Sequence, residues 1–382
     1  MTKFSSFPSI KQFRNTVTTV LKHSSDSDVP SIEFTGTVKI HGCNAGIRWD
    51  LDPTSSLCPQ SRNSTISVTK DNYQFAAYVN THSDAIKLIM KDIHTNYPPE
   101  SDEHQMIIYG EWCGNGIQSS VAVAKLKTKI YVVFGCVYVK DELDKNGDTV
   151  KRWLPDSSIK IKADNESKIY SIYEFGTWVK KITFKQPELG IIQNELAELT
   201  NEVENMCPVG KYFGIEGIGE GIVWEGHFTS PWDKKIHRLL FKVKGEKHSV
   251  TKVKTLSTVP IDVEKCKNII EFIETTVTEN RMIQGVEALN EMSETHITIR
   301  DIGKFIKWIY NDIIKEELDT MKASGIEPKD KNLNKGLSRK TSVWFGKHLD
   351  NIAFNSNKCV SYTPVTDRGD CRKCYLPINS HN

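Results

Sequence analysis

The chain has 382 residues, of which 38% are hydrophobic and 26% are charged, and this composition excludes a disordered or fibrous protein. A chain longer than about 250–300 residues usually forms more than one domain. No stretch approaches the ~20 consecutive apolar residues of a membrane span, and the first residues lack the layout of a secretory signal, so we expect a cytoplasmic protein without membrane partners. The formal net charge of +2 gives no global attraction to nucleic acid, although a local basic cluster can still bind phosphates.

Short strands dominate the first two thirds of the chain. Segment 32–39 alternates apolar and polar residues and is followed by Gly42, as expected for a half-buried strand that ends in a turn. The polar segment 141–148 is typical of a surface turn between two strands. Further strands are predicted at 106–109, 130–139, 221–224 and 239–243. These features predict an α+β fold built on antiparallel sheets.

The pattern becomes helical after about residue 247. Apolar residues recur at helical spacing in 263–277 and 301–318, and Thr298 followed by Asp301 resembles a capping box at the start of the second helix. We therefore predict three parts. They are a domain at 1–247, a linker at 248–258 and a smaller, mainly α-helical domain at 259–382.

The segment 329–340, within the helical part, is basic. Its cations are Lys329, Lys331, Lys335, Arg339 and Lys340. Such a run is either a contact for nucleic-acid phosphates or a solvated loop, and the sequence favours neither.

Nine cysteines are scattered along the chain, and their odd number argues against a disulfide framework. Cys371 and Cys374 have zinc-like spacing, with Cys359 upstream and His381 downstream. A structural zinc site needs four tetrahedral ligands. The pattern favours a tail with free thiols and leaves a zinc site as the alternative.

Lys39 is a candidate nucleophile. It ends the predicted strand 32–39 and is followed by His41 and Gly42. A lysine at the end of an apolar strand can lose part of its hydration, and neighbouring cations would further favour the neutral, nucleophilic amine. Gly42 would let the backbone approach a bound nucleotide. Taken alone this motif is weak, and a surface lysine is the alternative.

Three other residues, which lie later in the chain, could contact a bound nucleotide. Arg62 lies in a polar loop and could clamp a phosphate through two parallel hydrogen bonds. Glu111 follows an apolar strand between two glycines, where a carboxylate can accept hydrogen bonds from ribose hydroxyls. Phe134 could stack on a purine, although an aromatic residue inside an apolar strand more often belongs to the core.

A second acid and two lysines follow. Glu220 stands at the start of an apolar strand, and its oxygens suit Mg²⁺, which takes one or two carboxylates together with phosphate oxygens. Lys242 and Lys244 lie on one face of a strand because alternate side chains point the same way. Beside a nucleotide they would neutralise charge that develops on its phosphates. Each of the three could instead be a solvated surface residue.

The order and spacing of these residues resemble the signature of the covalent nucleotidyltransferases, the superfamily of polynucleotide ligases and messenger-RNA capping enzymes. The sequence is most similar to the RNA ligase 2 family of phages. That family's lysine motif also reads Lys-Ile-His-Gly, and it also carries an asparagine at the position of Asn44. The resemblance covers residues 34–247 and continues into the helical part at 278–281 and 301–305. One departure is Gly135, where the family often has an acid.

The resemblance implies a monomeric, ATP-dependent RNA ligase with an ATP-grasp-like nucleotidyltransferase domain and a helical domain that engages nucleic acid. Lys39 would attack the α-phosphate of ATP, Glu111 would hold the ribose, Phe134 would stack on adenine, and Mg²⁺, with Mn²⁺ as a substitute, would bind at Glu220. The residues implied for the chemistry are Lys39, His41, Asn44, Arg62, Lys242 and Lys244, and those implied for nucleotide binding are Val38, Ile40, Glu111, Phe134, Lys242 and Lys244.

The implied reaction has three transfers. AMP joins Lys39, moves to the 5′-phosphate of a strand, and leaves when a 3′-hydroxyl attacks that phosphate. The expected partner is RNA in a nicked duplex or an RNA/DNA hybrid, and the expected role is RNA repair, in the host cytoplasm if the chain is phage-encoded. The alternatives are a DNA ligase, a capping guanylyltransferase and a non-catalytic nucleic-acid-binding module. A DNA ligase is disfavoured because the tail reads as helical rather than as a further β-barrel.

Overall fold

The structure is a computed structural model that describes residues 4–24, 29–144, 149–185, 188–230, 234–245, 247–248, 269–292, 297–323 and 325–356. The chain divides into two compact units, Met1–Lys247 and His248–Asn382. The predicted linker lies outside the described residues except for His248, and so does the cysteine-containing tail, which includes Cys359, Cys371, Cys374 and His381. Within the described ranges, no helix has both the length and the apolar character needed to span a bilayer.

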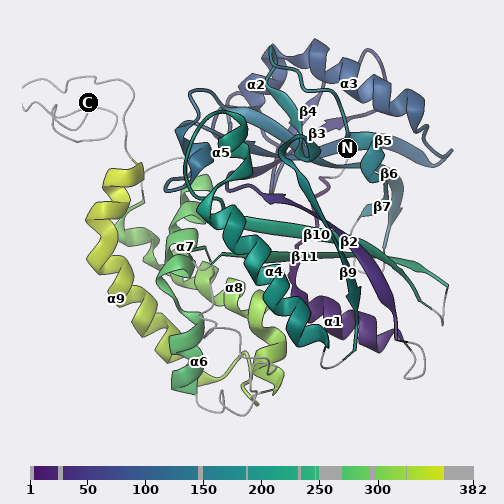
Figure 1. Cartoon of the computed structure of the whole chain (residues 1–382). Coiled ribbons are helices and arrows are strands. Elements are labelled where there is room, and N and C mark those ends of the chain that lie inside the picture. Colours follow the sequence, from purple (N-terminus) through teal and green to yellow (C-terminus); the bar gives the residue numbers. More distant parts are fainter. Residues whose placement is uncertain are drawn as a thin grey trace, which may run out of the picture. The chain divides into compact units, whose positions relative to one another are not determined.

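Two sheets form the framework of the first unit (Figure 1), and the predicted α+β fold with antiparallel sheets is confirmed. Five strands form the first sheet, in the order β1-β11-β10-β2-β9, and six belong to the second, in the order β4-β3-β5-β6-β7 with β8 beside β6. The first sheet contains β1 (Lys11–Gln12), β2 (Ser31–Lys39), β9 (Thr177–Thr183), β10 (Gly221–Thr229) and β11 (Ile236–Lys244). The second contains β3 (Cys43–Trp49), β4 (Cys58–Ser61), β5 (Glu103–Cys113), β6 (Ile130–Leu143), β7 (Thr149–Trp153) and β8 (Ile169–Ser171). The short pairings of β1 with β11 and of β8 with β6 are parallel, and all others are antiparallel.

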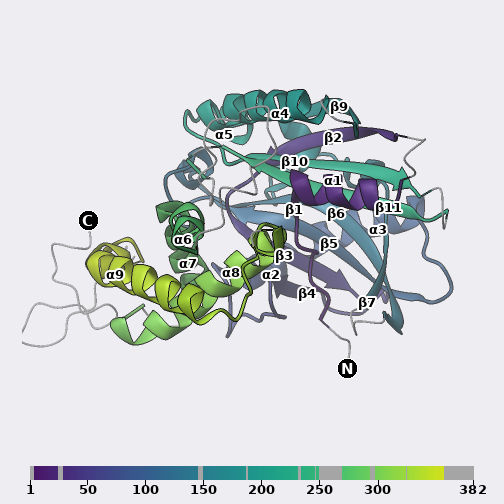
Figure 2. The same ribbon diagram turned by 90° about the horizontal axis from the view of Figure 1, so that it is seen from below.

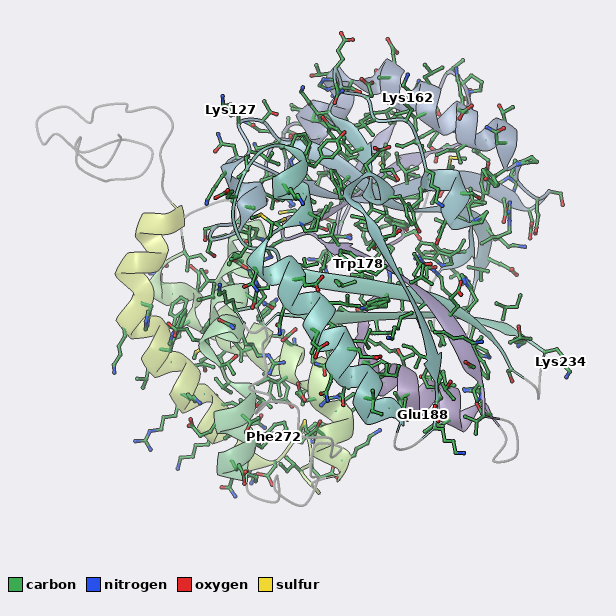
Figure 3. All side chains as sticks on the ribbon, viewed as in Figure 1. Lys127, Lys162, Trp178, Glu188, Lys234 and Phe272 are labelled. Carbon is green, nitrogen blue, oxygen red and sulfur yellow. The ribbon has the colours of Figure 1, made fainter. Side chains whose placement is uncertain are left out.

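Helices α1 and α4 pack against the first sheet, and α2 and α3 lie against the second (Figures 1 and 2). The helices of this unit are α1 (Phe13–Lys22), α2 (Phe75–Thr81), α3 (Ser83–Asn96), α4 (Glu188–Asn205) and α5 (Pro208–Tyr212). Helix α4 begins at Glu188, which Figure 3 labels, and an acid in the first turn suits the positive end of the helix dipole. Short 3₁₀ turns occur at Ala122–Lys125, Asp156–Ile159 and Ile172–Phe175.

Strand alternation gives each sheet one face in the main core and an opposite face that we call polar, although on the second sheet that face also buries Ile107 and Val137 in a smaller apolar cluster. On β2, Phe34 and Val38 are buried with Trp224 and Phe241 of the neighbouring strands, which leaves Lys39 on the opposite face. On β3, Ala45 and its alternate neighbours enter the same core. Asn44 and Gly46 therefore lie on the other face of the second sheet. The polar faces carry Lys39, Lys242 and Lys244 on the first sheet and Asn44 on the second.

The second unit is helical. It contains α6 (Ile269–Thr276), α7 (Glu279–Met292), α8 (Ile302–Ala323), α9 (Lys331–Ser356) and a 3₁₀ turn at Ile299–Asp301. Its apolar core includes Phe272, which Figure 3 labels, together with Phe305 and Phe345. The predicted capping box is confirmed, because Thr298 N–H donates to Asp301 Oδ2 at 3.0 Å and the Thr298 hydroxyl accepts from Arg300 N–H at 3.3 Å.

One buried charge organises the second unit. Arg281 is fully buried and donates to Asp312 Oδ2 at 2.9 Å and to the Thr276 carbonyl oxygen at 2.6 Å. Glu317, which is 1% exposed, lies 3.7 Å from the same guanidinium. A buried arginine is tolerated only with such partners, because the free energy of removing an unpaired charge from water is large.

Candidate active site

Three neighbouring strands of the first sheet bring Lys39 and Lys244 together. Lys39, the last residue of β2, pairs with Gly221 of β10, and Gly221 pairs with Lys244, the last residue of β11. Residues paired across a sheet project to the same side. The two lysines therefore stand in one row on the polar face, separated only by a glycine. Lys242 lies on the same face, next to Val223 of β10.

Glu220 stands at the centre of this row. Lys39 Nζ donates to its Oε2 at 2.6 Å, Lys244 Nζ lies 3.0 Å from its Oε1, and His41 Nδ1 lies 3.5 Å from Oε2. The Glu220 carboxylate is 2% exposed. Burial alone would raise the pKa of Glu220, but Lys39, Lys244 and the His41 hydrogen bond hold that pKa well below its usual range. The carboxylate is therefore an anion held between two cations.

This geometry differs from the sequence expectation for Lys39. Neighbouring cations were expected to favour its neutral form. Lys244 is indeed close, but the direct partner of the Lys39 amine is the Glu220 carboxylate. The sequence could not show this, because the two residues are 181 positions apart and meet only through the pairing of β2 with β10.

The glycine between the lysines is required by the backbone. Gly221 has a φ of +153°, and a Cβ there would overlap the Val243 carbonyl oxygen. Its N-terminal neighbour Glu220 is fixed in turn, because the Glu220 carbonyl oxygen accepts from Gly245 N–H at 3.1 Å. Both backbone features hold the Glu220 carboxylate between Lys39 and Lys244.

Glu111 supports the turn that follows Lys39. Its Oε1 accepts from Gly42 N–H at 2.9 Å, and a Cβ at Gly42 would lie 2.5 Å from the Trp112 carbonyl oxygen. The glycine therefore permits close packing of this turn on β5. The expectation that Glu111 holds a ribose stays a prediction, since at least one of its oxygens already accepts a backbone hydrogen bond.

Gln118 contacts the same turn and was not identified from the sequence. Its side-chain amide donates to the Gly42 carbonyl oxygen at 3.3 Å. Its φ of +56° lies in the left-handed region, which non-glycine residues seldom adopt. Strained backbone of this kind is often found at functional sites. The glycines at 114 and 116 were the available signal.

Other predicted residues are dispersed. Asn44 is half-buried and pairs with Glu111 across β3 and β5. Arg62 is exposed in the bend after β4, and no hydrogen bond or ion pair joins it to Lys39 or Glu220 in the described part of the chain. Val38 and Ile40 are 3% and 5% exposed and belong to the core. Strand alternation turns their side chains away from Lys39, so only their backbone could touch a nucleotide on the Lys39 side.

Phe134 occupies a β-bulge. Tyr109 pairs with Gly135 while Gly110 pairs with Val133, so Phe134 is the extra residue of β6. A bulge re-aims a side chain, and the Phe134 ring is in edge contact with Phe7 at 4.9 Å between centroids. Phe7 also contacts Tyr109 and Trp153. A small apolar cluster on the polar face of the second sheet therefore includes Phe134.

The polar faces of the two sheets meet beside this cluster. The guanidinium of Arg238, on β11, lies 3.8 Å from the ring centroid of Trp153, on β7. Arg238 is fixed by Glu225, whose Oε2 accepts from it at 2.6 Å. Because Arg238 shares its strand face with Lys242 and Lys244, the polar faces of the two sheets are turned toward one another at this contact.

The residues present fit a single bound divalent cation. No group of three or more His, Cys, Asp or Glu side chains that could hold a metal occurs among the residues that the structure describes. Mg²⁺, however, commonly takes only one or two carboxylates and completes its shell with phosphate and water oxygens. The anionic Glu220 carboxylate has the donor chemistry for that arrangement.

Comparisons with known proteins identify the family of the chain. The chain matches the RNA ligase family over residues 32–244, more than half of its length. Lys39, Glu111, Phe134, Glu220 and Lys244 all lie inside the match. No match was found among curated proteins.

Solved structures of a Naegleria gruberi RNA ligase are similar at a low level. The structure with PPi is 16% identical, with a TM-score of 0.38, and covers 64% of this chain. A mutant with ATP and Mn is 14% identical, also with a TM-score of 0.38. This chain spans 57% and 58% of those two chains. On the family match, with the lysine row and its buried carboxylate inside it, the chain belongs to the RNA ligase family.

Proposed function

We propose that the chain is an ATP-dependent RNA ligase that works through a lysyl-AMP intermediate on Lys39. The observation that carries the proposal is the cluster of Lys39, Glu220, Lys244 and His41 around one buried carboxylate. Nucleotidyl transfer needs three parts that this cluster has: a nucleophilic amine, a carboxylate that can bind a divalent cation, and a second lysine that can neutralise phosphate charge. Membership of the RNA ligase family supports the same assignment.

The first step forms a bond between Lys39 Nζ and the α-phosphorus of ATP. The bond from that phosphorus to the bridging oxygen breaks, pyrophosphate leaves with the electron pair, and the amine loses a proton to solvent water. Lys244 and Lys242 lie on the same face as Lys39 and would stabilise negative charge on the phosphate oxygens. Mg²⁺, or Mn²⁺ in its place, would be held by Glu220 and would neutralise phosphate charge when bound.

Phe134 and Glu111 would orient the nucleotide. Phe134 projects from its bulge on the polar face and would stack on adenine, and Glu111 would contact the ribose from the neighbouring strand. Asn44, beside Glu111, Arg62 and His41 would act on phosphates in the later transfers. In those transfers AMP moves to a 5′-phosphate, and a 3′-hydroxyl then attacks that phosphate and releases AMP.

The finer parts of the proposal concern the substrate. We assign nicked RNA duplexes or RNA/DNA hybrids as substrate and RNA repair in the cytoplasm as role, with a monomeric enzyme. The helical second unit would engage the nucleic acid.

Adenylylation tests the proposal. The full chain is first treated with pyrophosphate to remove any bound AMP, and is then incubated with Mg²⁺ and ATP labelled at the α-phosphate. We expect a labelled protein whose bond survives base and breaks in acid, and no label in Lys39→Ala. Labelling by GTP instead would indicate a capping guanylyltransferase. If neither nucleotide labels the parent chain, the ligase assignment is wrong and a nucleic-acid-binding module is the better account.

A further inference from the structure

Helix α9 carries two rows of side chains, each with a spacing of four residues. Leu333, Leu337, Thr341 and Phe345 are buried in the core of the second unit. The other row consists of Lys331, Lys335, Arg339, Val343 and Lys347, and all five are exposed. The rows are offset by two residues, which is about 200° around a helix, so they lie on opposite faces. The structure therefore overturns the solvated-loop interpretation of 331–340.

The exposed row, which we call the α9 ridge, is purely cationic apart from Val343. No Asp or Glu occurs from Lys331 to Leu349. Among the described residues, none of the four cationic side chains on the ridge has a hydrogen-bond or ion-pair partner. Lys340, by contrast, lies off the ridge and bonds to Glu274 at 2.8 Å. Like charges four residues apart destabilise a helix, so this arrangement is unfavourable for the fold alone.

Gly346 provides a second, independent observation. A glycine inside a helix lowers its stability, and it is usually retained where a neighbour leaves no room. Gly336 fits that explanation, because a Cβ there would overlap Ile273 Cδ1. Gly346 does not, since it is exposed and a Cβ there would meet no atom within 4 Å. It lies three residues after Val343 and beside Lys347, where it leaves the backbone open to close approach.

We infer that the α9 ridge is a docking surface for the phosphate backbone of duplex RNA. The inference rests on the proposed function in taking nucleic acid as the partner. The ridge runs from Lys331 to Lys347, which is 17 residues or about 24 Å of helix. Phosphates of one strand recur every ~3.4 Å along a duplex, so the ridge can meet several of them without reading bases. Cationic side chains that pair with no other described residue are available to phosphates, and the missing side chain at Gly346 lets a phosphate approach the helix backbone.

Binding of a labelled, nicked RNA duplex of about 24 base pairs tests the inference, measured by fluorescence anisotropy on the full chain between about 50 and 200 mM salt. The variant is Lys335→Gln with Arg339→Gln. The matched control is Lys307→Gln with Lys322→Gln, which removes the same charge from exposed positions of α8. Glutamine is a good helix former, so both variants should fold.

We expect the ridge variant to bind about tenfold more weakly and its log–log salt slope to be shallower by about 2, whereas the control stays near the parent. Gly346→Gln should weaken binding while raising the thermal midpoint, because it fills the gap yet favours the helix. Equal losses in ridge variant and control would overturn the inference. So would a ridge-dependent affinity for phosphatidylserine vesicles that exceeds the affinity for RNA. Adenylylation of each preparation is measured in parallel. If the parent chain is not adenylylated, the proposed function is refuted, and the binding measurements still decide whether the ridge binds duplex RNA.

Discussion

Lys39 Nζ lies 2.6 Å from Glu220 Oε2, so the candidate nucleophile is hydrogen-bonded to a buried carboxylate. Attack on a phosphorus requires a neutral amine whose lone pair points at that atom. The hydrogen bond to Glu220 fixes where the Lys39 amine lies, so the nucleotide must place its α-phosphate within reach of that position. Its phosphates would offer Lys244 an alternative to the other carboxylate oxygen of Glu220.

Glu220→Gln should abolish most adenylylation. A neutral amide lacks the negative charge that attracts two lysines and a divalent cation, and loss of one electrostatic group at an active site typically slows chemistry by about 10²–10³-fold. The rate of AMP incorporation measures the effect, with circular dichroism to verify folding. A rate within about twofold of the parent would show that the carboxylate has no part in the reaction.

Gly221→Ala should displace the end of β11. The new Cβ overlaps the Val243 carbonyl oxygen, so Lys244 must move away from Glu220. We expect slower adenylylation and a lower thermal midpoint. Gly303→Ala is the control, because that glycine lies in α8 with open space around it and alanine should be neutral or stabilising there.

Phe134→Leu should weaken nucleotide binding rather than chemistry. Stacking of a base on an aromatic ring contributes about 1–3 kcal/mol, so the ATP concentration for half-maximal adenylylation should rise about 5- to 150-fold. The rate at saturating ATP should change little. A variant with an unchanged ATP requirement would place Phe134 in the core alone, as its contact with Phe7 also allows.

Glu103→Gln should reduce stability in a pH-dependent way. Glu103 is buried, and although burial alone would raise its pKa, its paired hydrogen bonds with Arg152 at 2.8 and 2.6 Å lower it. A lowered pKa stabilises the fold above the unfolded value of ~4.3, and this contribution is lost as pH falls through the folded value. The parent should therefore exceed the variant by about 2 kcal/mol near neutral pH, and the gap should close in acid.

Urea unfolding across this pH range measures the gap. Glu202→Gln, at an exposed position on α4, is the control and should match the parent throughout. A gap for Glu103→Gln that persists unchanged in acid would assign its effect to packing rather than to charge.

Arg281→Met should destabilise the second unit by about 3–5 kcal/mol, because it removes the buried guanidinium that bonds to Asp312 and lies 3.7 Å from the buried Glu317. Denaturant unfolding measures this, and adding Glu317→Gln should recover part of the loss. No recovery would mean that Glu317 does not depend on Arg281.

Local patterns predicted much of the fold. The alternation in 32–39 corresponds to β2, and the apolar spacing in 301–318 corresponds to α8. Strand β5 extends beyond the predicted 106–109. The prediction was too short because the ends of the strand carry polar residues, which do not continue the apolar pattern. Glu103 pairs with Arg152, and Glu111 binds Gly42. Side chains whose partners are distant in sequence give no periodic signal.

The site was predictable in its residues but not in its contacts. Lys39, Glu220 and Lys244 each stood out beside an apolar strand. Their meeting depends on strand register, which no short pattern contains. Gln118 was not identified, because its strained backbone conformation has no pattern of its own and only the neighbouring glycines at 114 and 116 indicate it.

The order in which the site assembles follows from where its parts lie in the chain. Glu220 and Lys244 flank the single hairpin of β10 and β11, whose closure involves a short loop, whereas Lys39 must find them across 181 residues. Closing a long loop has the larger entropic cost. We therefore expect the nucleophile to be the last of the three to arrive during folding. A chain that carries AMP on Lys39 would then report that β2 has already paired with the β10–β11 hairpin.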